Sequence, residues 1–135
     1  MSLSAEVGQV IGTVVAEFRR DDLVRYAGAS GDFNPIHYND AAAAALGLPG
    51  VIAHGMLTMG TGLRVVTDWT QDPARVLTYY VRFTKPVVVP ATGAAQVIFT
   101  GTISAIKDGV ATVAIQAVCD EVKVLGSASA EVRLD

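Results

Sequence analysis

The pattern of apolar and polar positions differs between the two halves of the chain. In the second half, apolar residues form four stretches of strand length, at 76–83, 94–106, 110–120 and 122–134. Pro86 and Pro90 interrupt the chain between the first two stretches. Asp108-Gly109 separates the second from the third, and this dipeptide suits the positive φ angles of a tight hairpin turn. The second half therefore predicts a run of β-strands.

The first half begins with an apolar stretch and continues with two short helical segments. Residues 9–18 predict a first strand with weak alternation. Its apolar members are Val10, Ile11, Val14, Val15 and Phe18. Polar capping residues open a short helix over 19–28. A second short helix is expected through the alanine run 41–45, with Asn39 or Asp40 as its cap.

The segment from His54 to Trp69 is the one long helical candidate. Four of its apolar residues fall on one face by their spacing: Met56, Met59, Leu63 and Val66. We expect the methionines to lie in the core. Three glycines lower the helix propensity by up to about 1 kcal/mol each, namely Gly55, Gly60 and Gly62. A helix held closely by a sheet would use them for close approach. One long helix followed by a run of strands predicts an α+β fold.

The composition fits a globular chain that buries part of its surface against another subunit. The 135 residues suffice for a core, and we expect a single domain over residues 1–135. Hydrophobic residues make up 51% of the chain and charged residues only 17%. The net charge of -3 and the pI near 5.2 leave no basic stripe for phosphates, which argues against nucleic acid as a partner.

Few residues are available for redox or metal chemistry. Cys119 is the sole cysteine, so we expect no disulfide framework and no cysteine metal site. With His37 and His54 as the only histidines, a zinc site would need carboxylates and an unusual geometry, and we expect no metal and no cofactor. The chain start lacks the basic and apolar regions of a signal peptide, and Pro49 interrupts the apolar stretch 41–62. We therefore expect no membrane span and a cytoplasmic protein.

Residues 32–37 form the first of two clusters with candidate chemistry. They read Asp-Phe-Asn-Pro-Ile-His, and the Asn-Pro turn places Asp32 and His37 on one shaped loop. A carboxylate beside an imidazole is a general acid/base pair that moves protons near neutral pH. The alternative is that Asp32 caps a short helix and His37 is an ordinary surface residue.

Residues 52–57 form the second cluster and open the central helix, with Gly55 as its first residue. Free N–H groups at a helix start attract negative charge, and a glycine lets a ligand approach closely. A thioester carbonyl placed there would have its developing enolate stabilised, as in an oxyanion hole. Together the two clusters predict chemistry at the carbons α and β to a carbonyl.

Three motifs resemble those of a known family. They are Tyr26–His37 (YAGASGDFNPIH), Ile52–Gly60 (IAHGMLTMG) and Val81–Val87 (VRFTKPV). Over nearly the whole chain they resemble the MaoC-like or hydratase 2 family, and more narrowly the catalytic B subunit of type-II (3R)-hydroxyacyl-ACP dehydratases. The resemblance implies a hot-dog fold, in which an antiparallel sheet wraps a long central helix. It also implies that Asp32 and His37 are the catalytic dyad and that the Gly55 amide lies in the oxyanion hole.

The resemblance further implies a reaction and an assembly. We expect reversible hydration of a trans-2-enoyl thioester, carried on CoA or acyl carrier protein (ACP), to the (3R)-hydroxyacyl thioester. Hot-dog domains usually pair, so we expect a homodimer or higher oligomer, or a heterodimer with a non-catalytic hot-dog subunit. An acyl thioesterase and a non-catalytic acyl-binding subunit are the alternatives. The presence of both Asp32 and His37 argues against each.

The remaining candidate site residues have less definite roles. Asn34 either orients the water or His37, or simply forms the turn. His54 either contacts the substrate or, as we favour, fixes the helix start. Methionine adapts to flexible apolar ligands, so three residues of the central helix are expected to line the acyl path: Met56, Met59 and Leu63. Some family members carry a serine where this chain has Leu63, a departure that affects the outer support of the site.

Overall fold

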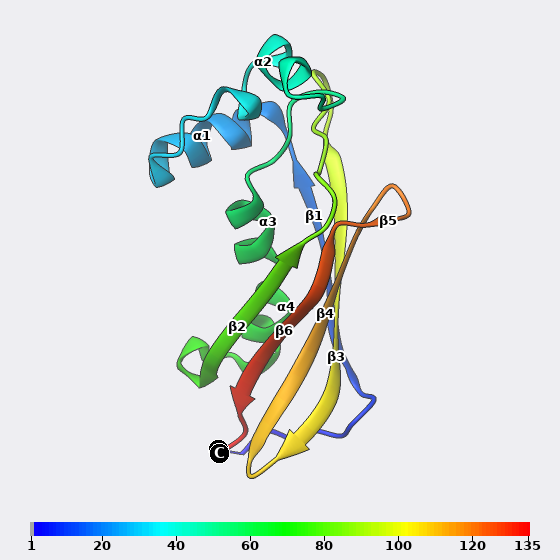
Figure 1. Cartoon of the computed structure of the whole chain (residues 1–135). Coiled ribbons are helices and arrows are strands. Elements are labelled where there is room, and N and C mark those ends of the chain that lie inside the picture. The colour runs from blue at the N-terminus through cyan, green and yellow to red at the C-terminus, as the bar shows by residue number, and fades with distance from the viewer. Residues whose placement is uncertain (1) are drawn as a thin grey trace.

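One antiparallel sheet forms the frame of the molecule (Figure 1). The computed structural model describes residues 2–135. The strands are β1 (Val10–Phe18), β2 (Val76–Phe83), β3 (Ala95–Lys107), β4 (Val110–Cys119), β5 (Val122–Lys123) and β6 (Leu125–Arg133). Their order is β1-β3-β4-β6-β2, and β5 pairs with β4. β1 and β2 are therefore the two edges of the sheet.

The strand predictions are confirmed, with one division that the apolar pattern did not indicate. β1 to β4 begin and end close to the expected limits. The expected last stretch, 122–134, is divided into β5 and β6 at Val124, whose carbonyl accepts a hydrogen bond from the Thr84 amide at 3.2 Å. Asp108 and Gly109 have φ angles of 53° and 75°, the positive values that a tight hairpin between β3 and β4 requires.

Within the described residues, four α-helices and two 3₁₀ turns complete the fold. They are α1 (Arg20–Ser30), η1 (Pro35–His37), α2 (Asp40–Ala45), α3 (Gly55–Gly62), α4 (Arg64–Thr70) and η2 (Pro73–Arg75). The side chain of Asn39 accepts a hydrogen bond from the Ala42 amide at 3.0 Å, which confirms Asn39 as the cap of α2. At the start of α1, the Asp22 carboxylate accepts from the Arg19 amide at 2.9 Å.

The expected central helix is present as two consecutive helices, α3 and α4. Leu63 alone separates them, and its φ of -65° and ψ of -16° continue a right-handed turn. The Thr61 hydroxyl donates to the Leu57 carbonyl at 2.7 Å, and back-bonds of this kind bend helices. Both helices lie on the same side of the sheet in Figure 1, with α4 packed against β1 and β3. This arrangement is the hot-dog fold that the motifs implied.

The face that the central helix turns toward the sheet is only partly the predicted one: Val66 is buried and Leu63 packs against the core, whereas Met56 points outward. Met56 is 61% exposed, and Met59 and Leu63 are only partly buried, so the expectation that the methionines lie in the core is wrong. The buried positions carry small or β-branched residues: Thr58, Gly62, Val65, Val66 and Thr70. Short side chains let the helix backbone approach the sheet closely. The need for close packing therefore decides which helix face is buried more than the apolar character of the residues does.

Of the central-helix glycines, Gly62 shows the expected close approach most clearly. A Cβ built on Gly62 would lie 3.0 Å from the Phe99 ring and 3.2 Å from the Tyr79 hydroxyl. That hydroxyl donates to the Met59 carbonyl at 2.6 Å, and its burial raises the pKa of Tyr79 to about 12. Gly60 has no heavy atom within 4 Å of its Cβ position, so close approach does not explain it.

The edge strand β2 presents apolar side chains to the outside. Leu77, Tyr80 and Phe83 are all half or more exposed. An edge strand also carries unpaired backbone N–H and C=O groups, which makes it a site for pairing with another chain. β2 therefore combines exposed apolar side chains with the unpaired backbone groups of a sheet edge.

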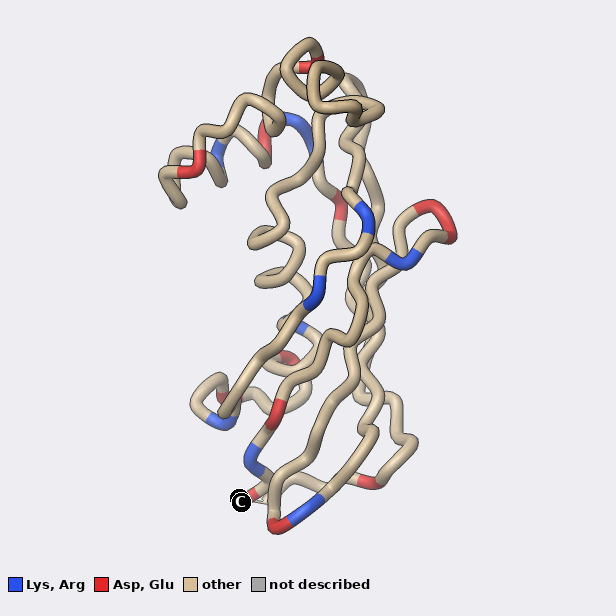
Figure 2. The backbone as a smooth tube through the Cα atoms, in the orientation of Figure 1, with Lys and Arg blue, Asp and Glu red and all other residues tan. Residues whose placement is uncertain are grey.

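Two further expectations concern cysteine and the membrane. Cys119 is buried and free of any disulfide, and burial together with the neighbouring charge of Asp120 raises the pKa of its thiol. No helix within residues 2–135 is long and apolar enough to cross a membrane. Basic and acidic segments are interspersed along the chain (Figure 2).

Candidate active site

The loop that follows α1 is shaped by its own polar groups. Gly31 ends α1 with a φ of 76°, and the Asp32 amide donates to the Ser30 hydroxyl at 3.1 Å. The Asp32 carboxylate accepts from the Asn34 amide at 3.2 Å, and the Asn34 side chain accepts from the Ile36 amide, also at 3.2 Å. These successive turns leave the Asp32 carboxylate half exposed. Asn34 thus forms the turn, and its second role, orientation of the water or of His37, stays a prediction.

His37 is held in one orientation at the end of the 3₁₀ turn η1. It is 7% exposed, so the alternative of an ordinary surface residue is wrong. Its Nδ1 lies 2.7 Å from the Ile52 carbonyl oxygen. Because a carbonyl only accepts, Nδ1 carries a proton, and in the neutral ring Nε2 offers a lone pair. That Nε2 lies 3.8 Å from the Asp32 Oδ2, a gap that one water can bridge.

His54 contacts both members of this pair. Its ring stacks on His37 with centroids 3.7 Å apart and planes inclined by 21°. Its Nε2–H donates to the Asp32 backbone carbonyl at 3.1 Å, and the Tyr26 ring meets it edge-on at 4.8 Å. Burial lowers the pKa of His54, against the raising effect of the bond to Asp32, and the charge of His37 lowers it further. His54 is thus a neutral support beneath the Asp32–His37 pair.

The burial of His54 bears on its two proposed roles. It is 1% exposed, and its Nδ1 has no hydrogen-bond partner among the described residues. A residue without accessible surface does not meet a ligand directly. The geometry therefore favours the structural role at the helix start over direct substrate contact.

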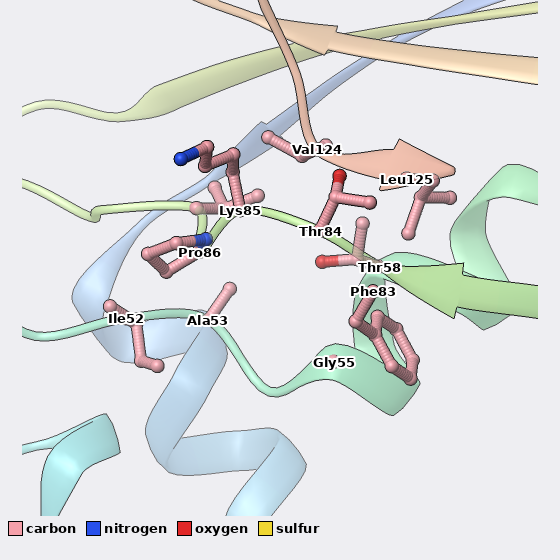
Figure 3. Close-up of a pocket in the computed structure, with 11 residues that line it drawn as sticks. Ile52, Ala53, Gly55, Thr58, Phe83, Thr84, Lys85, Pro86, Val124 and Leu125 are labelled. Atoms are coloured by element: carbon pink, nitrogen blue, oxygen red, sulfur yellow. The ribbon is translucent and has the colours of Figure 1, made fainter.

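Gly55 begins α3 and borders a cavity of about 260 Å³ (Figure 3). No described residue accepts a hydrogen bond from its amide. A Cβ on Gly55 would lie 3.1 Å from the Phe83 ring, so glycine lets Phe83 pack against the helix start. The other lining residues are Ile52, Ala53, Thr58, Phe83, Thr84, Lys85, Pro86, Val87, Val124 and Leu125. The cavity is mostly apolar and has one cationic side chain.

Ile52 joins the cavity to the dyad. Its carbonyl orients His37, its amide donates to the Ile36 carbonyl at 3.1 Å, and its side chain lines the cavity. The next residue, Ala53, donates through its amide to the Val87 carbonyl at 2.9 Å. Asp32 and His37 do not line the cavity themselves, so Ile52 and Ala53 are the physical connection between the Asp32–His37 pair and the cavity.

The structure brings some candidate residues together and leaves others apart. Asp32, His37, His54 and Gly55 form one continuous group through the contacts above. Met56, Met59 and Leu63 do not line the cavity beside Gly55, and their role along an acyl path stays a prediction. Phe83, Thr84 and Lys85 were not among the candidates. They belong to the VRFTKPV motif, in which β2 ends at Phe83, and the Phe83 ring lies against the helix start at Gly55.

The donor set is a poor match for a resident metal. Asp32, His37 and His54 each offer one ligand atom, and these atoms lie within 4.8 Å of one another. Zn²⁺ holds nitrogen and oxygen ligands at about 2.0–2.2 Å, which requires a tighter cluster. Two of the ring nitrogens also face backbone carbonyls. The expectation that no metal takes part stays a prediction.

The chain is similar to a curated dehydratase over part of its length. The chain is 48% identical over 73 residues to the 3-hydroxyacyl-thioester dehydratase X of Mycobacterium tuberculosis, a match that covers 54% of this chain and 25% of that protein. The chain thus spans only part of the length of this curated relative.

Solved structures give a fuller match. A structure described as a MaoC-like dehydratase superposes with a TM-score of 0.93 at 38% identity, covering 97% of this chain and 41% of that chain. The (R)-hydratase from A. caviae involved in PHA biosynthesis superposes with a TM-score of 0.81 at 25% identity, covering 98% of each chain. A family model described as a MaoC like domain matches residues 2–122. The chain therefore belongs to the MaoC-like domain family.

Proposed function

We propose that this chain catalyses the reversible hydration of trans-2-enoyl thioesters to (3R)-hydroxyacyl thioesters. The observation that carries the proposal is the placement of the Asp32–His37 pair next to the helix start at Gly55, which borders an apolar cavity. The names of the relatives, a 3-hydroxyacyl-thioester dehydratase and an (R)-hydratase, support the same reaction class.

The hydration uses a water held between the Asp32 carboxylate and His37 Nε2, which lie 3.8 Å apart. The water oxygen bonds to C3 while the dyad takes one of its protons, and the C2–C3 π electrons move into the thioester as an enolate. The amide at Gly55 donates to the enolate oxygen. The dyad then returns a proton to C2, so that one water has been added across the double bond. Dehydration follows the same steps in reverse.

The stereochemistry follows from the position of the dyad on one side of the substrate. Both groups reach the double bond from the same loop, so water and proton add to the same face. The carbonyl held at Gly55 decides which face this is. The (R)-hydratase relative supports assignment of that face to the (3R) product.

A coupled assay with crotonyl-CoA tests the proposal. We expect loss of the enoyl absorbance without release of free CoA thiol. We also expect no NADH formation when an (S)-specific hydroxyacyl-CoA dehydrogenase is added. Release of thiol would indicate the thioesterase alternative, and absence of any turnover would indicate a non-catalytic acyl-binding subunit. Prompt NADH formation would contradict the (3R) assignment.

We further propose that the chain works as a homodimer or higher oligomer, or beside a second hot-dog subunit. The exposed apolar side chains of the edge strand β2 and the 51% hydrophobic content support this. One solved structure with the same fold, at 23% identity, is a ChsH1-ChsH2 complex from Mycobacterium tuberculosis. A cytoplasmic location stays a prediction.

A further inference from the structure

The basic residues of the chain divide into paired and unpaired ones. Six arginines have a carboxylate oxygen within 4.0 Å: Arg19, Arg20, Arg25, Arg64, Arg75 and Arg133. Within residues 2–135, four basic residues have no such partner: Arg82, Lys85, Lys107 and Lys123. All four are exposed. An exposed cation without an internal partner is free to bind the anion of a ligand.

Three of these four cations lie near one another where β2 leaves the sheet. Arg82 pairs with Gly126 of β6, and a Cβ on Gly126 would lie 4.0 Å from the Arg82 side chain. The Thr84 hydroxyl donates to the Lys123 carbonyl at 3.4 Å, and Lys85 is the next residue. Figure 2 shows basic segments near one another at the end of β2 and beside β5. We call Arg82, Lys85 and Lys123 the cation cluster.

The surroundings separate the cation cluster from the rest of the charged surface. Asp120 and Glu121 lie beyond Lys123, at the tip of the hairpin between β4 and β5. Neither forms an ion pair with the cluster. The fourth unpaired cation, Lys107, lies at the opposite end of the sheet in the hairpin between β3 and β4.

Lys85 connects the cation cluster to the active site, because it lines the same cavity as Gly55. In Figure 3 the two residues lie on opposite sides of the cavity, and the Lys85 side chain extends away from Gly55. The residues between them are mostly apolar, with the hydroxyls of Thr58 and Thr84 among them. The cavity therefore has an oxyanion-type donor at one end and a cation at the other.

We propose that the cation cluster binds the phosphate at the end of a phosphopantetheine arm, and that the cavity between Lys85 and Gly55 holds the arm. The inference rests on the proposed function, which puts the thioester carbonyl at Gly55. From that carbonyl a pantetheine thioester runs through a largely neutral chain to a phosphate. In the ligand, the enolate oxygen, the neutral arm and the phosphate follow one another in this order. In the protein, the Gly55 amide, the apolar cavity and the cation cluster follow one another in the same order. The acyl tail then leaves Gly55 on the other side, away from Lys85.

A local cation site offsets the negative net charge of the chain. At -3 overall, the protein repels a phosphorylated substrate at long range. Three exposed cations at the cavity mouth make the local electrostatic potential positive. Exposed charge pairs contribute modestly and are screened by salt, so each cation is expected to change substrate affinity by a few-fold.

The test compares thioesters with and without phosphate. The variants are Lys85→Gln, the triple variant R82Q/K85Q/K123Q, and the matched control Lys107→Gln. For crotonyl-CoA at low salt we expect KM to rise about 3-fold in Lys85→Gln and about 10-fold or more in the triple variant, with kcat unchanged. For crotonyl-N-acetylcysteamine, which lacks phosphate, and for Lys107→Gln with either substrate, we expect no change. Equal changes for both substrates, or none for crotonyl-CoA, would overturn the proposal.

Further substrates identify the source of the phosphate. A rise in KM with crotonyl-4′-phosphopantetheine, crotonyl-CoA and crotonyl-ACP alike would assign recognition to the phosphate they share. A rise only with crotonyl-CoA would assign the site to the nucleotide phosphates, and a rise only with crotonyl-ACP to the carrier. No rise with any of them would refute the cation cluster as a phosphate site.

A binding measurement separates this inference from the proposed function. Calorimetric titration with CoA and with phosphate-free pantetheine needs no turnover. Suppose that the wild-type chain hydrates no thioester but binds CoA more tightly than pantetheine, and that the triple variant loses this difference in affinity. The cation cluster is then supported as a phosphate site, and the proposed reaction is refuted. If hydration occurs but the wild-type chain binds CoA and pantetheine equally well, the proposed reaction is supported and the cation cluster is refuted as a phosphate site.

Discussion

The rings of His37 and His54 lie face to face, with centroids 3.7 Å apart and planes inclined by 21°. Two imidazoles at this separation disfavour simultaneous protonation, since like charges repel strongly when partly buried. His54 is the more buried ring and its pKa is lowered, so His54 stays neutral beneath His37. The same ring donates to the Asp32 carbonyl, and it therefore aligns both members of the dyad.

The dyad itself gives the first prediction. Asp32→Asn and His37→Gln should each lower kcat by about 100-fold or more, within the usual effect of general acid/base groups. Asp32→Asn should keep its stability, because the amide oxygen still accepts the hydrogen bond from the Asn34 amide. Steady-state hydration of crotonyl-CoA measures the effect. Near-normal turnover of either variant would exclude that residue from the chemistry.

Truncation of His37 should also affect folding, because its imidazole is buried and holds a backbone carbonyl. His37→Ala leaves the Ile52 carbonyl without its partner in a partly buried position. A fully buried unsatisfied acceptor costs about 1–3 kcal/mol of unfolding free energy, so we expect a loss at the lower end of this range. Urea unfolding of His37→Ala and of Asp32→Ala measures the difference in unfolding free energy between the two variants. Equal stabilities would contradict a structural role of His37.

His54 provides the third prediction. His54→Phe keeps an aromatic ring against His37 but loses the N–H that holds the Asp32 carbonyl. Misalignment of the dyad should lower kcat by about 10- to 100-fold, with KM little changed. His54→Gln restores a side-chain N–H donor and should recover part of kcat. If both variants kept full kcat, or changed KM alone, His54 would have no positioning role.

The lowered pKa of His54 predicts a dependence of stability on pH. Below its usual pKa of 6.5, the unfolded chain protonates His54 while the folded chain keeps it neutral. Its contribution to stability is therefore complete above pH 6.5 and declines as the pH falls further, by at most about 1.4 kcal/mol per pH unit. Urea unfolding between pH 7.5 and 5 should show this decline in the wild type and a flatter profile in His54→Phe. Identical profiles would refute the assignment.

The two glycines near the end of α3 predict opposite effects of alanine. Gly62→Ala places a Cβ 3.0 Å from Phe99, and overpacking of this kind costs about 1–3 kcal/mol. Gly60→Ala meets nothing within 4 Å, and the better helix propensity of alanine adds up to about 1 kcal/mol. Thermal or urea unfolding of the two variants gives the comparison. A stabilising Gly62→Ala would mean that the helix lies farther from the sheet.

The edge strand β2 gives the prediction for assembly. Light scattering should report at least twice the monomer mass of 14.1 kDa. Tyr80→Lys, in the middle of β2, should weaken assembly, because it places a charge on the apolar edge. Val24→Lys on α1 is the control, since Val24 is equally exposed and lies away from β2. A stable and active wild-type monomer would contradict the assembly proposal.

Local chemistry explains why much of the fold could be predicted from the sequence. The Asp108-Gly109 turn and the Asn39 cap depend on neighbouring residues, and both are observed as expected. The buried face of the central helix depends on the sheet opposite it. Apolarity selected Met56, whereas the sheet admits Thr58 and Gly62.

The candidate site, like the fold, could be predicted where it depends on local motifs and not where it depends on distant residues. Asp32, His37 and Gly55 lie in recognisable motifs, and the structure groups them around one centre. The stacking of His54 on His37 joins residues that are seventeen positions apart, and no local pattern encodes it. Lys85 belongs to the cavity only because β2 ends beside the start of α3.

Ile52 has one further consequence for the chemistry. Its carbonyl holds the ring of His37 and its side chain forms part of the cavity wall. In the proposed complex, a displacement of this residue would move both the imidazole and the wall against which the thioester lies. The distance between His37 and the reacting carbon would then vary less than it would if separate residues held the two. A contact shared in this way would keep the imidazole aligned with the substrate even though Asp32 lies on an exposed loop.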